Sequence, residues 1–215
     1  MRTRKKKWAA GELENNPRIL RNESEYFGRL GEYFGDGLPI YLELGCGKGR
    51  FIIETSRQIE GVHFVAVERD ETILATAARR AEEKGAGSVV FVLADVSDGL
   101  DFVKAGEISR LYINFCDPWS RKKKWAKRRL THDTYLELYE KLQIPELFFK
   151  TDNRVLFEAS LESLSRRGWL VKNISLDLHN SGMENNIMTE YEEKFSAFGP
   201  IYRLEAQPQA VAHIL

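Results

Sequence analysis

The sequence predicts an α/β fold with one doubly wound, mostly parallel sheet of seven strands. Short apolar runs alternate with longer segments of helical spacing, a glycine-rich turn follows one of the first runs, and acidic residues end several of them. Strands alternating with helices favour right-handed crossovers and a parallel sheet covered on both faces. Ligands of such sheets bind at the carboxyl ends of the strands, near the point where strand order reverses.

Each element follows from its residue pattern. Apolar, β-branched or aromatic runs predict strands at residues 40–44, 63–67, 89–93, 111–115, 147–150, 169–176 and 201–205, the last as an edge strand. Helical spacing predicts helices at residues 50–59, 71–84, 134–142 and 156–166, the second of which is rich in alanine and glutamate.

Length and composition allow one domain with a substantial core. The chain has 215 residues, 43% of them hydrophobic, which is enough for a single core. We expect residues 1–22, rich in charge and containing Pro17, to form a basic mobile arm, and residues 23–215 to form the domain. No apolar run approaches the ~20 residues of a membrane span, and no apolar segment follows the charged N-terminus. We therefore expect a cytoplasmic protein without a membrane partner.

The two cysteines predict neither a metal site nor a disulfide. Cys46 and Cys116 lie far apart in the sequence without the spacing of metal ligands. We expect reduced thiols, no bound metal, and either a monomer or a homodimer.

Positive charge is concentrated in two segments. Residues 1–7 hold five basic side chains, and residues 121–129, here called the basic segment, hold seven and no acid. The seven are Arg121, Lys122, Lys123, Lys124, Lys127, Arg128 and Arg129. The chain has 32 basic and 32 acidic side chains, so without these 12 the remainder carries 20 against 32, a net charge of minus 12. This distribution favours one orientation of a polyanion. A solvated charge run is the alternative, but a block of one sign repels itself, and Trp119 and Trp125 are interleaved with it.

The turn after residues 40–44 indicates a cofactor site. Its sequence, LELGCGKGRF at residues 42–51, contains Gly45, Gly47 and Gly49 where a strand gives way to a helix. The dinucleotide fingerprint requires a glycine where this chain has Arg50. Glu43, in front of the turn, would repel a pyrophosphate and attract a cation. S-adenosylmethionine, with its sulfonium and ammonium groups, therefore matches better than a nicotinamide dinucleotide.

Two further acids complete the predicted pocket. Glu68 ends the next strand 23 residues after Gly45, close to the roughly 20-residue spacing of the acid that holds ribose hydroxyls. Asp95 follows the third strand, where a carboxylate can accept a hydrogen bond from the amine of adenine. An ordinary strand-end carboxylate is the alternative for each, but their coincidence beside a glycine turn favours one cofactor pocket.

With these residues in place, the chain resembles the bacterial tRNA (guanine-N7-)-methyltransferase family from end to end. The motifs that carry the resemblance are RKKKWA at 4–9, LELGCGKGRF at 42–51, VERD at 67–70, NFCDPW at 114–119, KRRLT at 127–131, FKTDN at 149–153 and MTEYEEKF at 188–195. The resemblance implies a single Rossmann-like domain that transfers a methyl group from S-adenosylmethionine to N7 of a guanosine in the variable loop of tRNA.

The resemblance also implies roles for particular residues. Glu43, Glu68, Asp95 and Asp117 would bind the cofactor, and Asp117 would also be catalytic. Asp152, Thr189 and Glu192 would bind the substrate together with a cation after the DPW turn. The family commonly has proline and lysine after DPW, whereas this chain has Ser120 and Arg121 in a segment that is one residue longer, so that cation is Arg121 or Lys122. The turn at residues 143–146 is shorter than the glycine-containing loop usual before FKTDN.

The chemistry of guanine N7 requires positioning more than proton transfer. N7 carries a lone pair and no proton, so holding it in line with the methyl donor supplies much of the rate. Asp152 and Glu192 are candidates to accept hydrogen bonds from the donors on the guanine edge, and Thr189 can contact the base or a phosphate. For Asp117 we expect an electrostatic and orienting role.

The aromatic and basic residues after Asp117 have roles of their own. Trp119 either stacks on a base or packs in the core, and Trp125 is expected to contact RNA. The remaining cations of the basic segment, Lys123, Lys124, Lys127, Arg128 and Arg129, are expected to bind phosphates without choosing a sequence.

Two rival functions remain open. NFCDPW loosely resembles the Asn/Asp-Pro-Pro-aromatic turn of amino-group methyltransferases, which act on adenine or protein, although it has one proline. A catalytically silent RNA-binding subunit is the other rival, but it would have no need of a pocket for a cationic cofactor. His132 and His179 lie in no nucleophile or metal constellation, and we expect neither to be catalytic.

Overall fold

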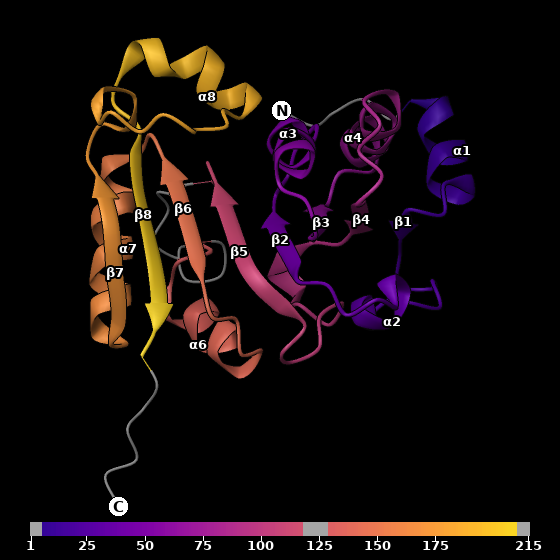
Figure 1. Cartoon of the computed structure of the whole chain (residues 1–215), viewed down its shortest axis with the longest axis horizontal. Helices are drawn as coiled ribbons and strands as arrows, with labels where there is room; N and C mark the ends of the chain where they lie inside the picture. Colours follow the sequence, from indigo (N-terminus) through magenta and orange to yellow (C-terminus); the bar gives the residue numbers. More distant parts are fainter. Residues whose placement is uncertain (1–5, 118–128, 210–215) are drawn as a thin grey trace, which may run out of the picture.

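The computed structural model of the chain describes residues 6–117 and 129–209. In Figure 1 these residues form one twisted sheet with helices on both faces. The strands described are β1 (Ile19–Leu20), β2 (Ile40–Leu44), β3 (His63–Glu68), β4 (Val89–Leu93), β5 (Ile108–Asn114), β6 (Leu147–Thr151), β7 (Trp169–Ser175) and β8 (Tyr202–Pro208). The helices described are α1 (Lys7–Asn15), α2 (Leu30–Phe34), α3 (Arg50–Gln58), α4 (Glu71–Glu83), α6 (Asp133–Lys141), α7 (Arg154–Arg166) and α8 (Glu190–Phe195). Short 3₁₀ turns η1 (Val96–Asp98), η2 (Leu178–Asn180) and η3 (Ser196–Phe198) complete them.

The order of the strands reverses at the centre of the sheet. The order is β1-β4-β3-β2-β5-β6-β8-β7. The pairs from β1 to β6 are parallel, and the pairs that β8 forms with β6 and β7 are antiparallel. The chain runs outward from β2 through β3 to β4 and then returns to place β5 on the other side of β2. The reversal therefore lies between β2 and β5, whose carboxyl ends are Leu44 and Asn114. This is the position at which a parallel sheet of this type binds ligands.

Two hydrophobic cores cover the two faces because successive strand residues point in opposite directions. In β3, Phe64 and Ala66 join the core beneath α1, α3 and α4, whereas Val65 and Val67 join the core formed with α2, α6 and α7. All four side chains are fully buried. Residues 64–67 of β3 are therefore continuously apolar, as expected for a parallel strand covered on both faces.

The first residues that the structure describes are packed against the domain. The sequence predicted a mobile arm through residue 22, but α1 lies against α4, and β1 pairs with β4 at the edge of the sheet. Ala9 and Leu13 are buried in this contact, and the guanidinium of Arg79 lies 4.2 Å from the centre of the Trp8 ring. The arm differs from the expectation because its few apolar residues fall on one face of a helix. Residues 1–5 lie outside the described residues.

The sheet differs from the predicted one in two other respects. The two-residue strand β1 makes eight strands among the described residues where the sequence predicted seven. The segment predicted as an edge strand at residues 201–205 is β8, which lies between β6 and β7 and is antiparallel to both. The apolar pattern identified the strand correctly but contains no information about which neighbours it pairs with.

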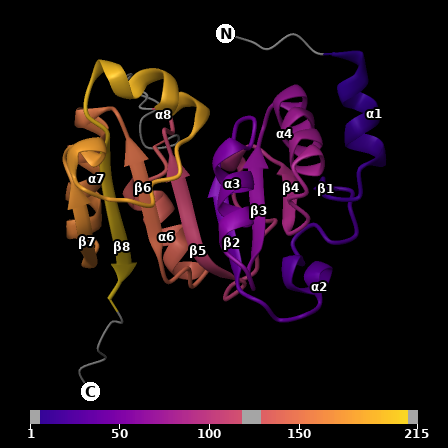
Figure 2. The same cartoon turned by 45° about the horizontal axis from the view of Figure 1, so that its top comes forward.

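A short helix lies over the carboxyl-end edge of the sheet. Figures 1 and 2 show α8 above the ends of β6 and β8, reached from β7 by a long connection. No helix among residues 6–117 and 129–209 is long and apolar enough to cross a membrane.

Candidate active site

The glycine turn between β2 and α3 has a backbone that favours glycine. Gly45, Gly47 and Gly49 have φ angles of 79°, 57° and 80°, in the left-handed region where other residues are strained. The N–H groups of Gly45 and Cys46 both donate to the carbonyl of Val67 at 2.9 Å, which ties the turn to the end of β3.

The three glycines have different neighbours. A Cβ atom at Gly49 would lie 3.0 Å from the Cβ of Ala77, so this glycine allows α3 to pack closely on α4. A Cβ atom at Gly45 or Gly47 would meet no protein atom within 4 Å. The open backbone of the turn is therefore at Gly45 and Gly47.

Glu43 is a buried carboxylate with one unpaired oxygen. Its side chain is 1% exposed, and its Oε1 accepts a hydrogen bond from the amide of Asn114 at 2.9 Å. Oε2 is buried and has no hydrogen-bond partner among the described residues. Burial raises the pKa of Glu43 to about 7, against the lowering effects of the Asn114 hydrogen bond and the Lys150 charge. A buried carboxylate with this environment is stabilised by a cationic ligand.

Glu68 and Asp95 lie at the ends of the next two strands. Glu68 accepts backbone hydrogen bonds from Arg69, Asp70 and Gly47 at 2.9, 3.0 and 3.2 Å, so its orientation toward the glycine turn is fixed. Burial raises the pKa of Asp95, but hydrogen bonds from Ser97 and the charge of Arg69 outweigh it, and the net pKa is lowered. Asp95 is therefore a stable anion at neutral pH.

These acids line two adjoining cavities. One, of about 230 Å³, is lined by Glu68, Asp95 and Asp117, and the other, of about 140 Å³, by Glu43 together with residues of α3 and α8. Gly45 and Phe115 line both cavities, which are therefore neighbours across the glycine turn. The predicted cofactor residues Glu43, Gly45, Gly47, Glu68, Asp95 and Asp117 are thus brought together, whereas Gly49 lines neither cavity.

The combined site can accommodate an elongated, positively charged ligand. At one end, the buried Oε2 of Glu43 has no hydrogen-bond partner within residues 6–117 and 129–209, and a ligand ammonium could supply one. Toward the other end, the carboxylates of Glu68 and Asp95 can accept hydrogen bonds from hydroxyl and amino groups. The two cavities are lined by five carboxylates and two arginines, Arg50 and Arg69, so acidic side chains predominate around the site and disfavour a phosphate.

Comparisons with known proteins agree with this geometry. The model of a family described as "putative methyltransferase" matches residues 38–204. The tRNA (guanine-N(7)-)-methyltransferase of Halalkalibacterium halodurans is 45% identical over 211 residues, covering 96% of both proteins. The enzyme of the same name from Clostridioides difficile is 43% identical over 212 residues, covering 96% of this chain and 99% of its own. The chain belongs to the tRNA (guanine-N(7)-)-methyltransferase family.

Solved structures show the same fold at low sequence identity. A structure titled as an antibiotic-related methyltransferase has a TM-score of 0.57 and is 18% identical, covering 85% of this chain and 92% of its own. The chain is therefore a family member with the α/β methyltransferase fold that its sequence predicted.

Asp117 lies at the edge of the larger cavity. It follows β5 in the NFCDPW motif and lines the larger cavity with Glu68 and Asp95. Two residues earlier, Phe115 has a φ angle of 51°, a left-handed backbone that is uncommon outside glycine. Strained residues of this kind cluster at ligand sites, where surrounding contacts hold them in place. The predicted site residues Arg121, Lys122, Lys123, Lys124, Trp125, Lys127 and Arg128, together with Trp119, lie outside the described residues.

Glu192, one of the two carboxylates predicted to bind guanine, is fully buried. Its Oε2 pairs with Lys150 at 2.8 Å, and its Oε1 accepts from Asn186 at 2.6 Å and lies 3.1 Å from His179. With its oxygens engaged in these contacts, Glu192 does not reach an incoming base in this structure. Its position is instead that of an anchor for α8.

Thr189 and Lys150 complete this anchor. Thr189 caps α8, since its hydroxyl accepts from the Glu192 N–H while the Glu192 carboxylate accepts from the Thr189 N–H. Lys150, on β6, also donates to the carbonyl of Ile187 at 2.9 Å. Sequence reasoning missed Lys150, although a lysine inside an otherwise apolar strand (LFFKT) is a signal of a buried partner.

Asp152, the other carboxylate predicted to bind guanine, is exposed. It follows β6 and accepts a hydrogen bond from the Tyr191 hydroxyl at 2.9 Å. Tyr191 also lines the smaller cavity with Glu43, which places Asp152 next to the site. Sequence reasoning singled out neither Tyr191 nor Asn114, although both lie inside motifs of the family resemblance.

Arg129 does not lie on the surface as a phosphate-binding residue would. Its side chain is buried, and its guanidinium donates to the Ser163 hydroxyl at 2.9 Å and to the carbonyl of Ala159 at 3.4 Å, both on α7. Burial lowers the pKa of Arg129. We infer from these contacts that Arg129 fixes the end of the basic segment to the domain, which corrects its predicted role as an RNA contact.

The two histidines considered in the sequence have structural neighbours. His132 caps α6 by accepting from the Thr134 N–H, and burial together with the charge of Arg129 lowers its pKa. His179 lies beside Glu192 in the anchor of α8. No group of three or more potential metal ligands occurs within residues 6–117 and 129–209.

Proposed function

We propose that this protein transfers a methyl group from S-adenosylmethionine to N7 of a guanosine in the variable loop of tRNA, and that it does so in the cytoplasm. The observation that carries the proposal is the buried carboxylate of Glu43, which lines a cavity beside the glycine turn and has one oxygen without a hydrogen-bond partner among the described residues. Membership of the family supports the choice of tRNA and of guanine N7, because the relatives are named for that reaction.

The cofactor supplies an activated methyl group on a sulfonium. Glu43 would bind its ammonium group, Glu68 its ribose hydroxyls, and Asp95 the amine of its adenine, each by accepting hydrogen bonds. The bonds from Arg69, Asp70 and Gly47 hold Glu68 in place before a ligand arrives, so little ordering is needed on binding.

The chain's own residues would position guanine rather than deprotonate it. N7 has a lone pair and no proton, so a general base has nothing to remove. Asp152 would accept hydrogen bonds from the guanine edge, and the hydroxyl of Tyr191 already orients that carboxylate. Asp117 would stabilise the positive charge that develops on the purine.

The experiment that tests the proposal maps the product. Bulk unmodified tRNA is incubated with the protein and labelled S-adenosylmethionine, and the RNA is digested to nucleosides. We expect N7-methylguanosine, recovered from a variable-loop fragment. N6-methyladenosine would instead support an amino-group methyltransferase. Absence of cofactor binding at millimolar concentration in calorimetry would support a silent RNA-binding subunit.

A further inference from the structure

The exposed aromatic side chains of the described residues lie within one stretch of eight residues. Tyr191 is 41% exposed, Phe195 42% and Phe198 83%. The other large hydrophobic residues exposed in residues 6–117 and 129–209 are aliphatic. A local concentration of exposed rings marks an interaction surface more often than a chance arrangement does.

These rings form a continuous series that begins at the active site. The ring centre of Phe115, which lines both cavities, lies 5.1 Å from that of Tyr191. Tyr191 lies 4.4 Å from Phe195, and Phe195 lies 6.2 Å from Phe198. We call these four residues the aromatic ladder. It runs from the residue before Cys116 and Asp117 outward to the most exposed ring, that of Phe198.

The inner part of the ladder is fixed by polar contacts. The Tyr191 hydroxyl donates to Asp152, and the neighbouring Glu192 is held by Lys150 beneath α8. Tyr191 is therefore presented in one orientation, with its ring beside the cavity and its hydroxyl on the carboxylate proposed to bind guanine. The residues further out, Phe195 and Phe198, have no comparable polar tether in the described structure.

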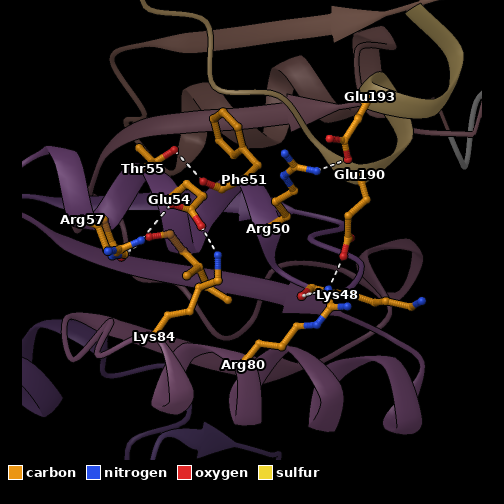
Figure 3. Close-up of polar contacts among 12 residues, drawn as sticks. Lys48, Arg50, Phe51, Glu54, Thr55, Arg57, Arg80, Lys84, Glu190 and Glu193 are labelled. Atoms are coloured by element: carbon orange, nitrogen blue, oxygen red, sulfur yellow. Dashed lines mark hydrogen bonds and ion pairs between the residues drawn. The ribbon is translucent and has the colours of Figure 1, made fainter.

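The charge around the ladder does not exclude a polyanion. Helix α8 has three glutamates, and each is paired with a cation from another element. Figure 3 shows Arg50 pointing to Glu193 and Arg80 pointing to Glu190, and the third glutamate pairs with Lys150. Neutralised in this way, α8 presents its aromatic face to RNA without a strong local repulsion.

Single-stranded RNA supplies the chemistry that such a surface binds. Unpaired bases stack on exposed aromatic rings, and this contact depends little on the identity of the base. A base buried in a folded RNA must also leave its stack before an enzyme can reach it, and it then needs a replacement surface.

We propose that the aromatic ladder is a stacking surface for unpaired bases of the tRNA, with Tyr191 beside the target guanine and Phe195 and Phe198 beneath the nucleotides that flank it. This inference rests on the proposed function, because it takes tRNA as the substrate. It adds a base-binding surface to the phosphate contacts predicted for the basic segment.

Binding and turnover of ladder variants test the inference. The variants are Phe198→Ala, Phe195→Ala, Tyr191→Phe and Tyr191→Leu, with Leu170→Ala as the matched control. Leu170 is 50% exposed and lies at the start of β7. In Figure 1 this strand begins at the lower end of the sheet, whereas α8 lies over the upper end. The measurements are the Kd for an unmodified tRNA transcript, single-turnover methyl transfer, and the Kd for S-adenosylmethionine by calorimetry.

We expect Phe198→Ala to raise the Kd for tRNA about tenfold, the typical loss of one stacking contact, without changing the Kd for the cofactor. Tyr191→Leu should lower the rate at saturating tRNA at least tenfold, because it removes both the ring and the hydroxyl. Tyr191→Phe removes only the hydrogen bond to Asp152 and keeps the ring, so its loss of rate should be clearly smaller than that of Tyr191→Leu. Leu170→Ala should behave as the parent protein. Since Phe198 is largely exposed, its variant has no reason to misfold, and a thermal melt checks this.

Several outcomes would overturn the inference. Unchanged tRNA affinity in a Phe195→Ala, Phe198→Ala double variant removes the ladder from the RNA interface. A double variant that dissociates a dimer in sedimentation, with tRNA affinity unaltered, shows that the ladder joins two copies of the chain instead. If the parent protein binds and methylates tRNA while the variants do the same, this inference alone fails. If the parent protein does not bind tRNA, the proposed function fails with it.

Discussion

At the scale of single residues, Glu43 shows how a binding site is maintained against the stability of the fold. Burial disfavours its charged form, and the one hydrogen bond from Asn114 leaves the second oxygen without a partner among the described residues. A residue of this kind is expected where a cation is bound, because the ligand provides the positive charge and the hydrogen-bond donor that the second oxygen needs. Its environment therefore has a measurable consequence for the protein without ligand.

We predict that the stability of the ligand-free protein falls as pH rises through the window between about 4.5 and 7. In the folded chain Glu43 has a pKa of about 7, whereas in an unfolded chain its pKa is near the ordinary value of 4.5. The folded state thus binds more protons in this window, so unfolding becomes easier as pH rises. Glu43→Gln should remove this dependence and stabilise the protein at pH 8 by on the order of 3 kcal/mol.

Urea denaturation between pH 5 and 8 measures this change in stability. The affinity for the cofactor should change in the opposite direction and rise with pH. Binding of a cation favours ionised Glu43, so the Kd for S-adenosylmethionine should fall as pH rises toward 7, and Glu43→Gln should weaken binding throughout. Parallel stability profiles for the parent and the variant would show that Glu43 titrates normally.

For Asp117 we predict an electrostatic role that does not involve proton transfer. Asp117→Asn keeps the shape of the side chain but removes its charge, and single-turnover methyl transfer with saturating cofactor and tRNA should fall about a hundredfold, as when one preorganised electrostatic contact is lost. The pH dependence of the residual rate should be unchanged, because no proton is abstracted. A full transfer rate in the variant would exclude Asp117 from catalysis.

At the scale of elements, α8 is held to the sheet chiefly by a buried ion pair. Lys150 and Glu192 are 7% and 0% exposed, and Lys150 also donates to Asn186 and to the backbone of Ile187. Burial lowers the pKa of Lys150, against the raising effect of Glu192. Breaking such a pair is costly mainly because it leaves an uncompensated buried charge.

We therefore predict that Lys150→Met destabilises the protein by about 3 kcal/mol or more, and that adding Glu192→Leu recovers part of the loss. The exposed pair of Arg154 and Glu158 is the matched control, since its atoms are also 2.8 Å apart but Arg154→Met should cost less than about 1 kcal/mol. The free energy of unfolding in urea measures all three. Equal losses for Lys150→Met and Arg154→Met would contradict the anchoring role of the buried pair.

The end of α6 stores strain in a turn that lacks glycine. Gln143 has a φ angle of 57°, while the N–H groups of Gln143 and Ile144 bond to the carbonyls of Glu140 and Tyr139. This is the hydrogen-bond pattern of a helix end whose left-handed position usually holds glycine. The short turn predicted at residues 143–146 thus keeps the geometry of a glycine turn with a glutamine in it.

We predict that Gln143→Gly raises the free energy of unfolding by on the order of 0.5 kcal/mol. Relief of the left-handed strain, about 1 kcal/mol or more, exceeds the entropic cost of the added glycine. Gln143→Ala is the control, because alanine keeps the strain and should not stabilise. A stabilisation of equal size in both variants would assign the effect to the loss of the glutamine side chain.

At the scale of the whole molecule, the order of apolar runs predicted most of the sheet and its covering helices. Strands buried on both faces have continuous apolar sequences, and β4 and residues 64–67 of β3 are of this kind. The position of the site followed too, because three acids and a glycine turn at strand ends must meet at one edge of a parallel sheet.

The elements that the sequence did not reveal depend on contacts between distant residues. Helix α8 has six residues, three of them glutamates, and its burial of Glu192 depends on Lys150, 42 positions earlier. The insertion of β8 between β6 and β7 is likewise a choice of partner that an apolar pattern does not encode. From the sequence alone, Arg129 is predicted to be a surface cation like the rest of the basic segment. Its buried contact with Ser163 is apparent only in the structure.

The distribution of charge over the whole chain predicts how salt affects tRNA binding. If the basic segment binds phosphates, replacing Lys123, Lys124 and Arg128 by glutamine should weaken tRNA binding and flatten the plot of log affinity against log salt by about 0.7 to 0.9 per lost contact. The matched control replaces Arg57, Lys104 and Lys141, which are each at least half exposed. Arg57 and Lys141 lie in the last turns of α3 and α6, and Lys104 lies shortly before β5. The control variant loses the same charge, so a general effect of net charge would change both plots equally. A slope that stays unchanged when the basic segment is neutralised would remove that segment from the tRNA interface.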